Sequence, residues 1–182
     1  MRVIVGLGNP GEKYARTRHN AGFIALDEYL SKEPWREEKK FNALVCEKDG
    51  IIFMKPLTFM NESGYSVRKV LAYYHLLPNV IGFTKKDSDL SNILAVIHDD
   101  IDLSIGTCKL GANSGSAGHK GINSIISSLK TKNFTRLRIG IKNELAKTKI
   151  PTEKFVLQPF SGDELETLKK TSSQIERLAD IA

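Results

Sequence analysis

The sequence has little cysteine and no long hydrophobic run. Its 182 residues include two cysteines, Cys46 and Cys108, which are far apart, so we expect no disulfide framework and a reducing compartment. No apolar segment approaches the length of a membrane span, and the N-terminus lacks the basic and apolar regions of a secretory signal. These absences predict a soluble, cytoplasmic protein that does not bind a membrane.

The catalytic motifs of covalent hydrolases are also missing. No serine lies in a G-x-S-x-G turn, and neither cysteine has a polar neighbourhood that would activate its thiol. If the protein is a hydrolase, attack by an activated water is therefore favoured over attack by a covalent nucleophile.

Acidic residues are outnumbered by basic ones. The chain has 27 Lys and Arg against 21 Asp and Glu, and its pI is near 9.3. Such a surface attracts polyanions such as nucleic acids weakly, although a soluble protein with another role can carry the same charge. With 182 residues and 41% hydrophobic residues, the chain is long enough for one full core, so residues 1–182 are expected to form a single domain.

Short apolar runs alternate with amphipathic helical patterns, which is typical of an α/β fold. The pair Asp49 and Gly50 separates two of the runs by a two-residue turn, so part of the sheet should be antiparallel. We predict an α/β sandwich with a mixed, mostly parallel central sheet flanked by helices. The expected strands are Arg2–Val5, Ala43–Glu47, Ile51–Lys55, Ile93–Ile97, Thr107–Leu110 and Leu137–Ile141.

Helical faces are marked by apolar residues three or four positions apart. The last helix should begin at a capping box, with Ser161 three residues before Glu164. The polar stretch Asn79 to Asn92 is expected to be a surface loop or insertion. Three helical faces precede the last helix: Phe23, Leu26 and Leu30; Val67, Val70, Leu71 and Tyr74; and Ile122, Ile125, Ile126 and Leu129.

The first strand ends in GLGNPG, whose glycines have the G-x-G-x-x-G spacing of a dinucleotide-binding loop. The surroundings do not fit that role. Asn9 and Pro10 stand where a helix should begin, and the acidic residues about 20 positions on, Asp27 and Glu28, lie inside a helical pattern instead of ending a second strand. No nicotinamide cofactor is expected.

Among four histidines, His19 is the candidate for chemistry. It lies in YARTRHNAG, between a loop with two arginines and a helix that Asn20 could cap. His75 and His98 are expected to be structural or solvated, and His119 lies in a glycine turn that needs little side-chain chemistry.

Polar residues follow three of the predicted strands. Asn9, Asn61 and Asp99 come after them, where functional groups gather in open α/β sheets. With His19 they would form a site suited to hydrolysis, in which the imidazole takes a proton from water, the carboxylate supports the imidazolium and an amide donates to the oxyanion.

Two stretches allow other interpretations. In HDDIDL, the residues His98, Asp99, Asp100 and Asp102 could hold a divalent metal for phosphoryl chemistry, as in a nuclease or phosphatase. In KPLTFMNESG, Phe59 and Met60 could line a binding surface, or could fill the core while Asn61 or Ser63 caps the following helix.

Seven motifs in order, GLGNPG, YARTRHNAGF, PLTFMNESG, HDDIDL, GSAGHKG, RLRIGI and FVLQPF, closely resemble bacterial-type peptidyl-tRNA hydrolase from Arg2 to about Phe160. The resemblance implies a monomeric enzyme with an α/β sandwich fold and no metal. Such an enzyme would cleave the ester between a peptide and the 3′ ribose of a tRNA, acting at the acceptor end with its 3′ CCA, and would recycle prematurely released peptidyl-tRNA.

The resemblance also assigns roles to individual residues. It implies that His19 is the catalytic base and Asp99 its partner, that Asn9 faces the substrate, and that Asn61 places the water and the peptide backbone. It further implies that the substrate cleft is lined by Tyr14, Phe59 and Met60. Arg138 is expected to contact tRNA phosphates.

The sequence departs from the family pattern at the mouth of this site. Lys120 replaces the usual amide of G-H-N-G, and Gly111 replaces a basic residue for which Lys109 could substitute. The stretch IKNE replaces a Gly and Pro pattern, and the Asn79 to Asn92 segment is longer than usual. Because a cation is disfavoured at a helix N-terminus, we expect an anion to compensate Lys120, and the tRNA backbone is the expected one. The rival functions are the metal-dependent enzyme and an RNA-binding module without catalysis.

Overall fold

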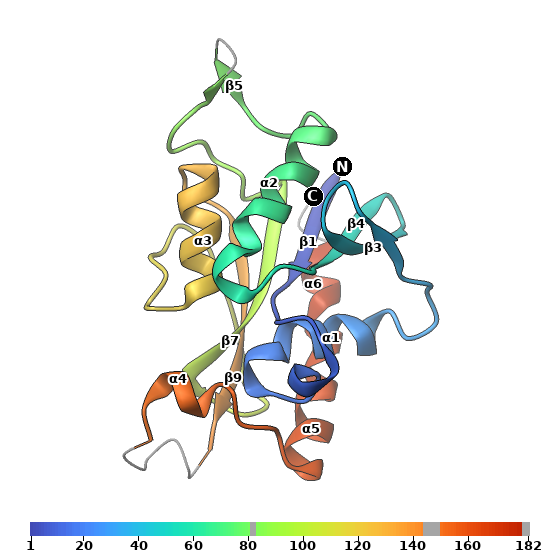
Figure 1. Cartoon of the computed structure of the whole chain (residues 1–182), viewed down its shortest axis with the longest axis vertical. Helices are drawn as coiled ribbons and strands as arrows, with labels where there is room; N and C mark the ends of the chain where they lie inside the picture. The colour runs from blue at the N-terminus through green and yellow to red at the C-terminus, as the bar shows by residue number, and fades with distance from the viewer. Residues whose placement is uncertain (81–82, 144–149, 180–182) are drawn as a thin grey trace.

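The computed structural model describes residues 1–80, 83–143 and 150–179. They form an α/β sandwich around a seven-stranded sheet with the order β2-β3-β4-β1-β7-β9-β8 (Figure 1). The strands of this sheet are β1 (Arg2–Gly6), β2 (Arg36–Glu38), β3 (Ala43–Lys48), β4 (Ile51–Pro56), β7 (Leu94–Ser104), β8 (Cys108–Gly111) and β9 (Thr135–Lys142).

The sheet is mixed, as predicted. Its four central strands, β4, β1, β7 and β9, run parallel, whereas β2, β3 and β8 are added antiparallel at the edges. The hairpin between β3 and β4 is confirmed, and both turn residues have the positive φ that such a tight turn requires, 51° at Asp49 and 74° at Gly50.

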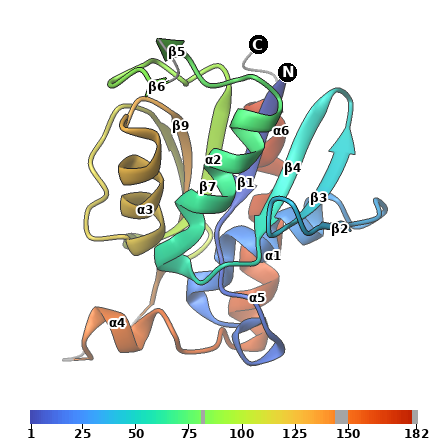
Figure 2. The ribbon, with the colours of Figure 1, turned by 45° about the horizontal axis from the view of Figure 1, so that its top comes forward.

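Helices cover both faces of the sheet (Figure 2). The strand β1 shows why two layers are needed, because Val3 and Val5 pack into one core while Ile4 packs into the other. The helices α2 (Ser63–Tyr73) and α3 (Lys120–Leu129) bury Val67, Ile122 and their neighbours against the first face. On the second face lie α1 (Ala21–Tyr29), α4 (Thr152–Phe155), α5 (Gly162–Lys169), the 3-10 helix η5 (Lys170–Ile175) and α6 (Glu176–Ala179).

Three sequence expectations differ from the structure. The predicted Ile93–Ile97 strand is too short, because β7 continues through the acidic residues and pairs with β9 up to Asp100 and again at Ser104. The Asn79 to Asn92 segment is not a simple loop, since β5 (Asn79–Val80) and β6 (Phe83–Thr84) pair within it and Leu90 is buried. The predicted last helix is three successive helical segments, α5, η5 and α6. No helix among the described residues is long and apolar enough to cross a membrane.

A buried arginine joins the two ends of the chain. The guanidinium of Arg18 is 2% exposed and lies between the rings of Phe155 and Phe160, 4.8 and 5.0 Å from their centroids. Its Nη2 donates to both carboxylate oxygens of Glu164, at 3.0 and 2.8 Å. Glu164 also closes the predicted capping box with Ser161, so the same carboxylate starts α5 and neutralises the buried charge.

We predict that Glu164→Gln lowers the free energy of unfolding by about 2–3 kcal/mol at neutral pH, because it leaves the Arg18 charge buried without a carboxylate. Burial by itself raises the pKa of the Glu164 carboxyl, but the Ser161 N–H, Arg18 and Asn143 outweigh it and hold the pKa below its ordinary value of 4.5. The stabilisation is therefore fully present above about pH 4.5 and is lost as the pH falls through the folded-state pKa.

Urea unfolding of the wild type and the variant at a series of pH values tests this prediction. The matched control is Glu166→Gln on the same helix, whose exposed carboxylate pairs only with Lys169 and should cost less than about 0.5 kcal/mol. If the difference in unfolding free energy between the wild type and Glu164→Gln grew as the pH fell, the stabilising role given to the Glu164 carboxylate would be contradicted.

Candidate active site

The loop that follows β1 packs tightly against the start of α1. A Cβ on Gly8 would lie 2.6 Å from Cγ of Phe23, so only glycine allows this approach. Gly11 has φ of 100°, a backbone conformation that glycine adopts without strain. The next element is the 3-10 helix η1 (Glu12–Tyr14), and α1 begins only at Ala21. The glycine spacing therefore serves helix packing and a turn, and the helix that a dinucleotide fingerprint would start directly after the glycines begins only at Ala21.

The same loop fixes the amide of Asn9. Asn20 accepts from the backbone N–H of Asn9 at 2.9 Å and donates to its backbone carbonyl at 3.0 Å. The Oδ1 of Asn9 accepts from the backbone N–H of Met60 at 2.9 Å, which leaves its Nδ2–H groups as the donors of a nearly buried side chain. Asn20 occupies the N-cap position of α1, as expected, but its side chain makes no cap hydrogen bond and is engaged with Asn9 instead.

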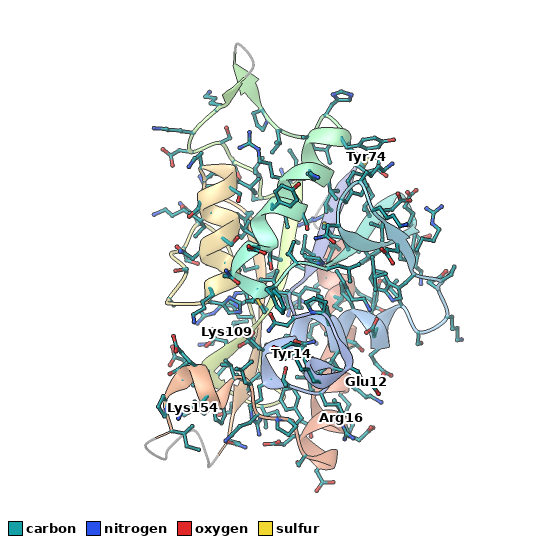
Figure 3. The ribbon with its side chains drawn as sticks, in the orientation of Figure 1. Glu12, Tyr14, Arg16, Tyr74, Lys109 and Lys154 are labelled. Atoms are coloured by element: carbon teal, nitrogen blue, oxygen red, sulfur yellow. The ribbon has the colours of Figure 1, made fainter. Side chains whose placement is uncertain are left out.

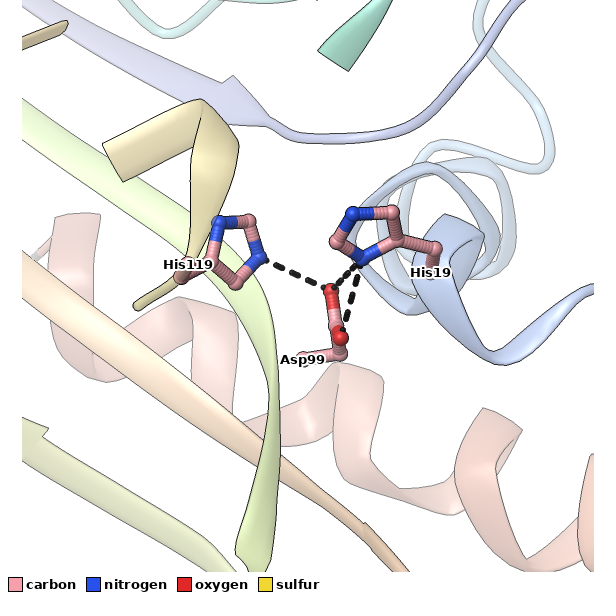
Figure 4. A group of neighbouring side chains, drawn as sticks. All are labelled: His19, Asp99 and His119. Carbon is pink, nitrogen blue, oxygen red and sulfur yellow. Dashed lines mark hydrogen bonds and ion pairs between the residues drawn. The ribbon is translucent and has the colours of Figure 1, made fainter. Parts of the chain in front are cut away.

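His19 lies on the 3-10 helix η2 (Arg18–Asn20), directly before α1. Its backbone N–H donates to the carbonyl of Val156 at 2.8 Å, and that of Arg18 donates to Gln158 at 3.0 Å, so the segment after α4 holds this turn in place. The imidazole Nδ1 lies 2.9 and 3.1 Å from the two carboxylate oxygens of Asp99 (Figure 4). The structure thus brings together the two residues that the sequence singled out 80 positions apart.

Asp99 is 4% exposed and has a second histidine partner. His119, directly before α3, places its Nε2 2.9 Å from Asp99 Oδ1, on the other side of the carboxylate from His19 (Figure 4). Burial by itself would raise the pKa of the Asp99 carboxyl, but the imidazoles of His119 and His19 outweigh it and hold the pKa well below its ordinary range. Asp99 is therefore a carboxylate at neutral pH.

The expectation that His119 needs little side-chain chemistry is wrong, because its side chain caps α3 and contacts Asp99. Its glycine-rich neighbourhood is typical of a turn, and its partner Asp99 is 20 residues away in the sequence. The one available signal was the position of His119 immediately before the apolar pattern of α3, where cap residues stand.

The acidic cluster of HDDIDL does not converge on one point. Alternate residues of a strand face opposite sides, and Asp100 is bound to Arg138 Nε at 2.5 Å while Asp99 faces the histidines. His98 is buried, and burial lowers its pKa to about 3, so it is neutral. The alternative interpretation, in which this stretch holds a divalent metal, is therefore not favoured. Within the described ranges, the side chains with metal-ligand spacing are instead His19, Asp99 and His119, whose ligand atoms lie within 4.8 Å of one another.

The predicted substrate-facing residues lie at the same end of the molecule. The ring of Phe59 is 54% exposed and meets the edge of Tyr14, with centroids 6.5 Å apart. Met60 is buried and Asn61 exposed, both on the 3-10 helix η3 (Met60–Glu62). Neither Asn61 nor Ser63 caps α2, since the cap position is Glu62 and makes no side-chain cap bond. No contact between described residues joins Asn61 to His19 or Asp99.

Several basic side chains lie on β8, β9 and the starts of α3 and α4. Lys109 on β8 is the cross-strand neighbour of Arg138 on β9. Lys109 and Lys154 share the lower part of the view with Tyr14 (Figure 3). Lys120 begins α3, as predicted, and its compensating anion in the structure is Glu153 of α4, with Nζ 3.0 Å from Oε1. The expected tRNA contact thus has a competitor within the chain.

Comparison with known proteins places the chain among enzymes of translation. The sequence profile of the family described as peptidyl-tRNA hydrolase matches residues 3–182. Proteins of that name from Mycoplasma capricolum and Lactobacillus gasseri are 44% and 41% identical, over 94% and 90% of this chain and 87% and 83% of theirs. The crystal structure of the peptidyl-tRNA hydrolase from Acinetobacter baumannii is similar with a TM-score of 0.80 and 29% identity, covering 100% of this chain and 86% of that one.

We predict that Asn20→Ala lowers the free energy of unfolding by about 1–3 kcal/mol, because both backbone polar groups of Asn9 lose their buried partners. Asn61→Ala is the matched control. Its amide is exposed, so we expect a change within about 0.5 kcal/mol. Chemical denaturation of the two variants measures both values, and equal losses would contradict the role given to Asn20.

Proposed function

The chain belongs to the peptidyl-tRNA hydrolase family, which hydrolyses the ester between a peptide and tRNA, and from this premise we propose that His19 is the general base of the reaction. The observation that carries the proposal is the buried carboxylate of Asp99, 2.9 Å from Nδ1 of His19. An ionised Asp99 accepts a hydrogen bond from Nδ1–H of His19, which leaves the lone pair of Nε2 to accept a proton from water.

The proposed reaction has two steps. The water oxygen bonds to the ester carbonyl carbon while His19 Nε2 takes a water proton, and the carbonyl electrons move onto an oxyanion. Collapse of this intermediate breaks the bond to the 3′ oxygen of the ribose, which takes the proton back from the imidazolium. The products are tRNA with a free 3′ hydroxyl and the peptide carboxylic acid, which releases the second water proton to solvent and leaves as the carboxylate.

The two amides are assigned to the reacting carbonyl. Asn9 supplies an Nδ2–H donor whose orientation is set by the bond from Met60 N–H to its Oδ1, and a preset donor stabilises a developing oxyanion. Asn61 places the water and the peptide backbone from the adjacent helix η3. Its exposed amide is free of other bonds to the described residues and is available for this role.

Substrate binding is assigned to the aromatic and basic residues around the site. Tyr14 and Phe59, beside Met60, contact the 3′ CCA and the peptide, and Arg138 and Lys120 bind phosphates of the acceptor end. The side chain of Arg138 is 36% exposed, so it can reach a ligand while paired with Asp100. The proposal includes a monomeric cytoplasmic enzyme that uses neither a metal nor nicotinamide.

Peptide release from an N-blocked aminoacyl-tRNA, with and without excess EDTA, tests the reaction and its cofactor requirement. We predict an unchanged rate in EDTA, because the assigned groups are an imidazole, a carboxylate and amides. A short N-blocked aminoacyl oligonucleotide ending in CCA is the control substrate. Because it has no tRNA fold to lose, it separates an effect of EDTA on the enzyme from an effect of EDTA on tRNA folding. Loss of turnover on both substrates, restored by Mg²⁺ or Mn²⁺, would overturn this part of the proposal.

We predict that His19→Ala lowers turnover by about a hundredfold or more and leaves tRNA affinity nearly unchanged, since it removes the base and no phosphate contact. Asp99→Asn should cost less, because it misorients the base without removing it. The control is His75→Asn, an exposed histidine with φ of 56° that asparagine tolerates. A His19→Ala enzyme with most of its rate would refute the mechanism.

We predict that Lys120→Ala raises KM more than it lowers kcat and reduces the slope of log affinity against log salt by about 1. Glu153→Gln should act in the opposite direction on KM, because the carboxylate competes with phosphate for Lys120. Both side chains are mostly exposed, 59% and 75%, so their pairing is weak and easily exchanged. Lys32→Ala, an exposed lysine beyond the far end of α1, is the control, and unchanged values for Lys120→Ala would make Lys120 a bystander.

A further inference from the structure

Both ring nitrogens of His119 are hydrogen-bonded. Nδ1 lies 3.1 Å from the backbone nitrogen of Gly121 and 3.3 Å from that of Ile122, so His119 caps the N-terminus of α3. Nε2 lies 2.9 Å from Oδ1 of Asp99. His119 therefore connects a helix end to the carboxylate of the active site.

These partners fix the position of the proton on the ring. A backbone N–H can only donate, so Nδ1 must present a lone pair to Gly121 and Ile122. The single proton of a neutral imidazole is then on Nε2, where it points to Asp99. The Nε2–H tautomer is thus selected by the backbone of α3 and by a carboxylate that can only accept.

The surroundings also oppose a second proton on His119. That proton would have to enter Nδ1, against two N–H groups and the positive end of the α3 dipole. The charged and titratable groups around the ring are His19 on η2, Asp99 and His98 on β7, Arg136 on β9 and Lys120 on α3. The neutral His98 ring packs against His119 with centroids 4.7 Å apart, so one side of the ring is closed to water.

We propose that His119 is a positioning residue for the hydrolysis, an Nε2–H donor that orients Asp99 and shares its negative charge with His19. The inference rests on the proposed role of His19 as the base. Oδ1 of Asp99 accepts from His119 and from His19, both at 2.9 Å, so less of its charge is available to hold an imidazolium at His19. His119 thereby weakens the hold of Asp99 on a protonated His19.

The same proton assignment accounts for the close approach of the three side chains without a metal. His19 Nδ1 and His119 Nε2 both direct a proton, rather than a lone pair, toward Asp99. A metal ligand must present a lone pair. The metal-like spacing of His19, Asp99 and His119 is that of a carboxylate between two N–H donors.

Nitrogen NMR of the full chain labelled with ¹⁵N-histidine tests the proton assignment without reference to activity. At about pH 8, where an ordinary imidazole is neutral, His119 should show a protonated Nε2 and an unprotonated Nδ1. The His119→Asn spectrum assigns the signals. A proton on Nδ1 at this pH would overturn the inference.

Kinetics of His119→Asn test the functional part. Asparagine caps a helix but is too short to reach Asp99, so it retains the cap and removes the donor. We expect unchanged thermal stability and KM, a kcat lower by about tenfold, and an acidic limb of the kcat profile moved to higher pH, because Asp99 then holds the His19 imidazolium more tightly. His119→Ala, which also loses the cap, should lose stability as well.

The two proposals fail differently. An unchanged kcat and pH profile in His119→Asn, with an inactive His19→Ala, would refute the role of His119 and leave the role of His19 standing. A lower kcat with an unmoved acidic limb would mean that His119 acts only on structure. An active His19→Ala would refute the base itself.

Discussion

The buried charge of Arg18 is the constraint on which the site depends. A guanidinium that is 2% exposed is tolerated only with a full set of partners, and these come from the other end of the chain: the carbonyl of Ile141, the rings of Phe155 and Phe160, and Glu164. The turn that carries His19 therefore takes its place only when β9, α4 and α5 have packed. His19 is held by the C-terminal third of the fold, although it lies near the N-terminus.

Asp99 extends this dependence to the opposite face of the sheet. Its carboxylate is bound by His19, next to α1, and by His119, at the start of α3, so the two helical layers meet at one side chain of β7. A buried carboxylate needs such donors to remain ionised. The requirements of stability and of catalysis coincide here, since the groups that make burial of Asp99 tolerable are also those that orient the proposed base.

The fold class and most strands were predictable from the sequence because each depends on a local pattern. Val3 to Val5 are apolar, and Asp49-Gly50 specifies a hairpin. The continuation of β7 was not predictable, because Asp99 and Asp100 are typical of loops, and the side chains that bind their carboxylates within the strand, His19, His119 and Arg138, are distant in sequence. Long-range partners of polar groups leave no periodic signal, which also explains why the bonds between Asn20 and Asn9 were not predicted.

The N-terminus of α3 shows how closely packing and chemistry are joined. A Cβ on Gly121 would lie 2.5 Å from Sδ of Met60 and 3.2 Å from Cε1 of His119. The backbone here therefore packs closely between Met60, which binds Asn9, and His119, which binds Asp99. Lys120, between His119 and Gly121, therefore stands on a helix end whose position is set by the site itself. Because its side chain points outward to Glu153, the chain can exchange an amide for a cation here without disturbing the hydrogen bonds of His119.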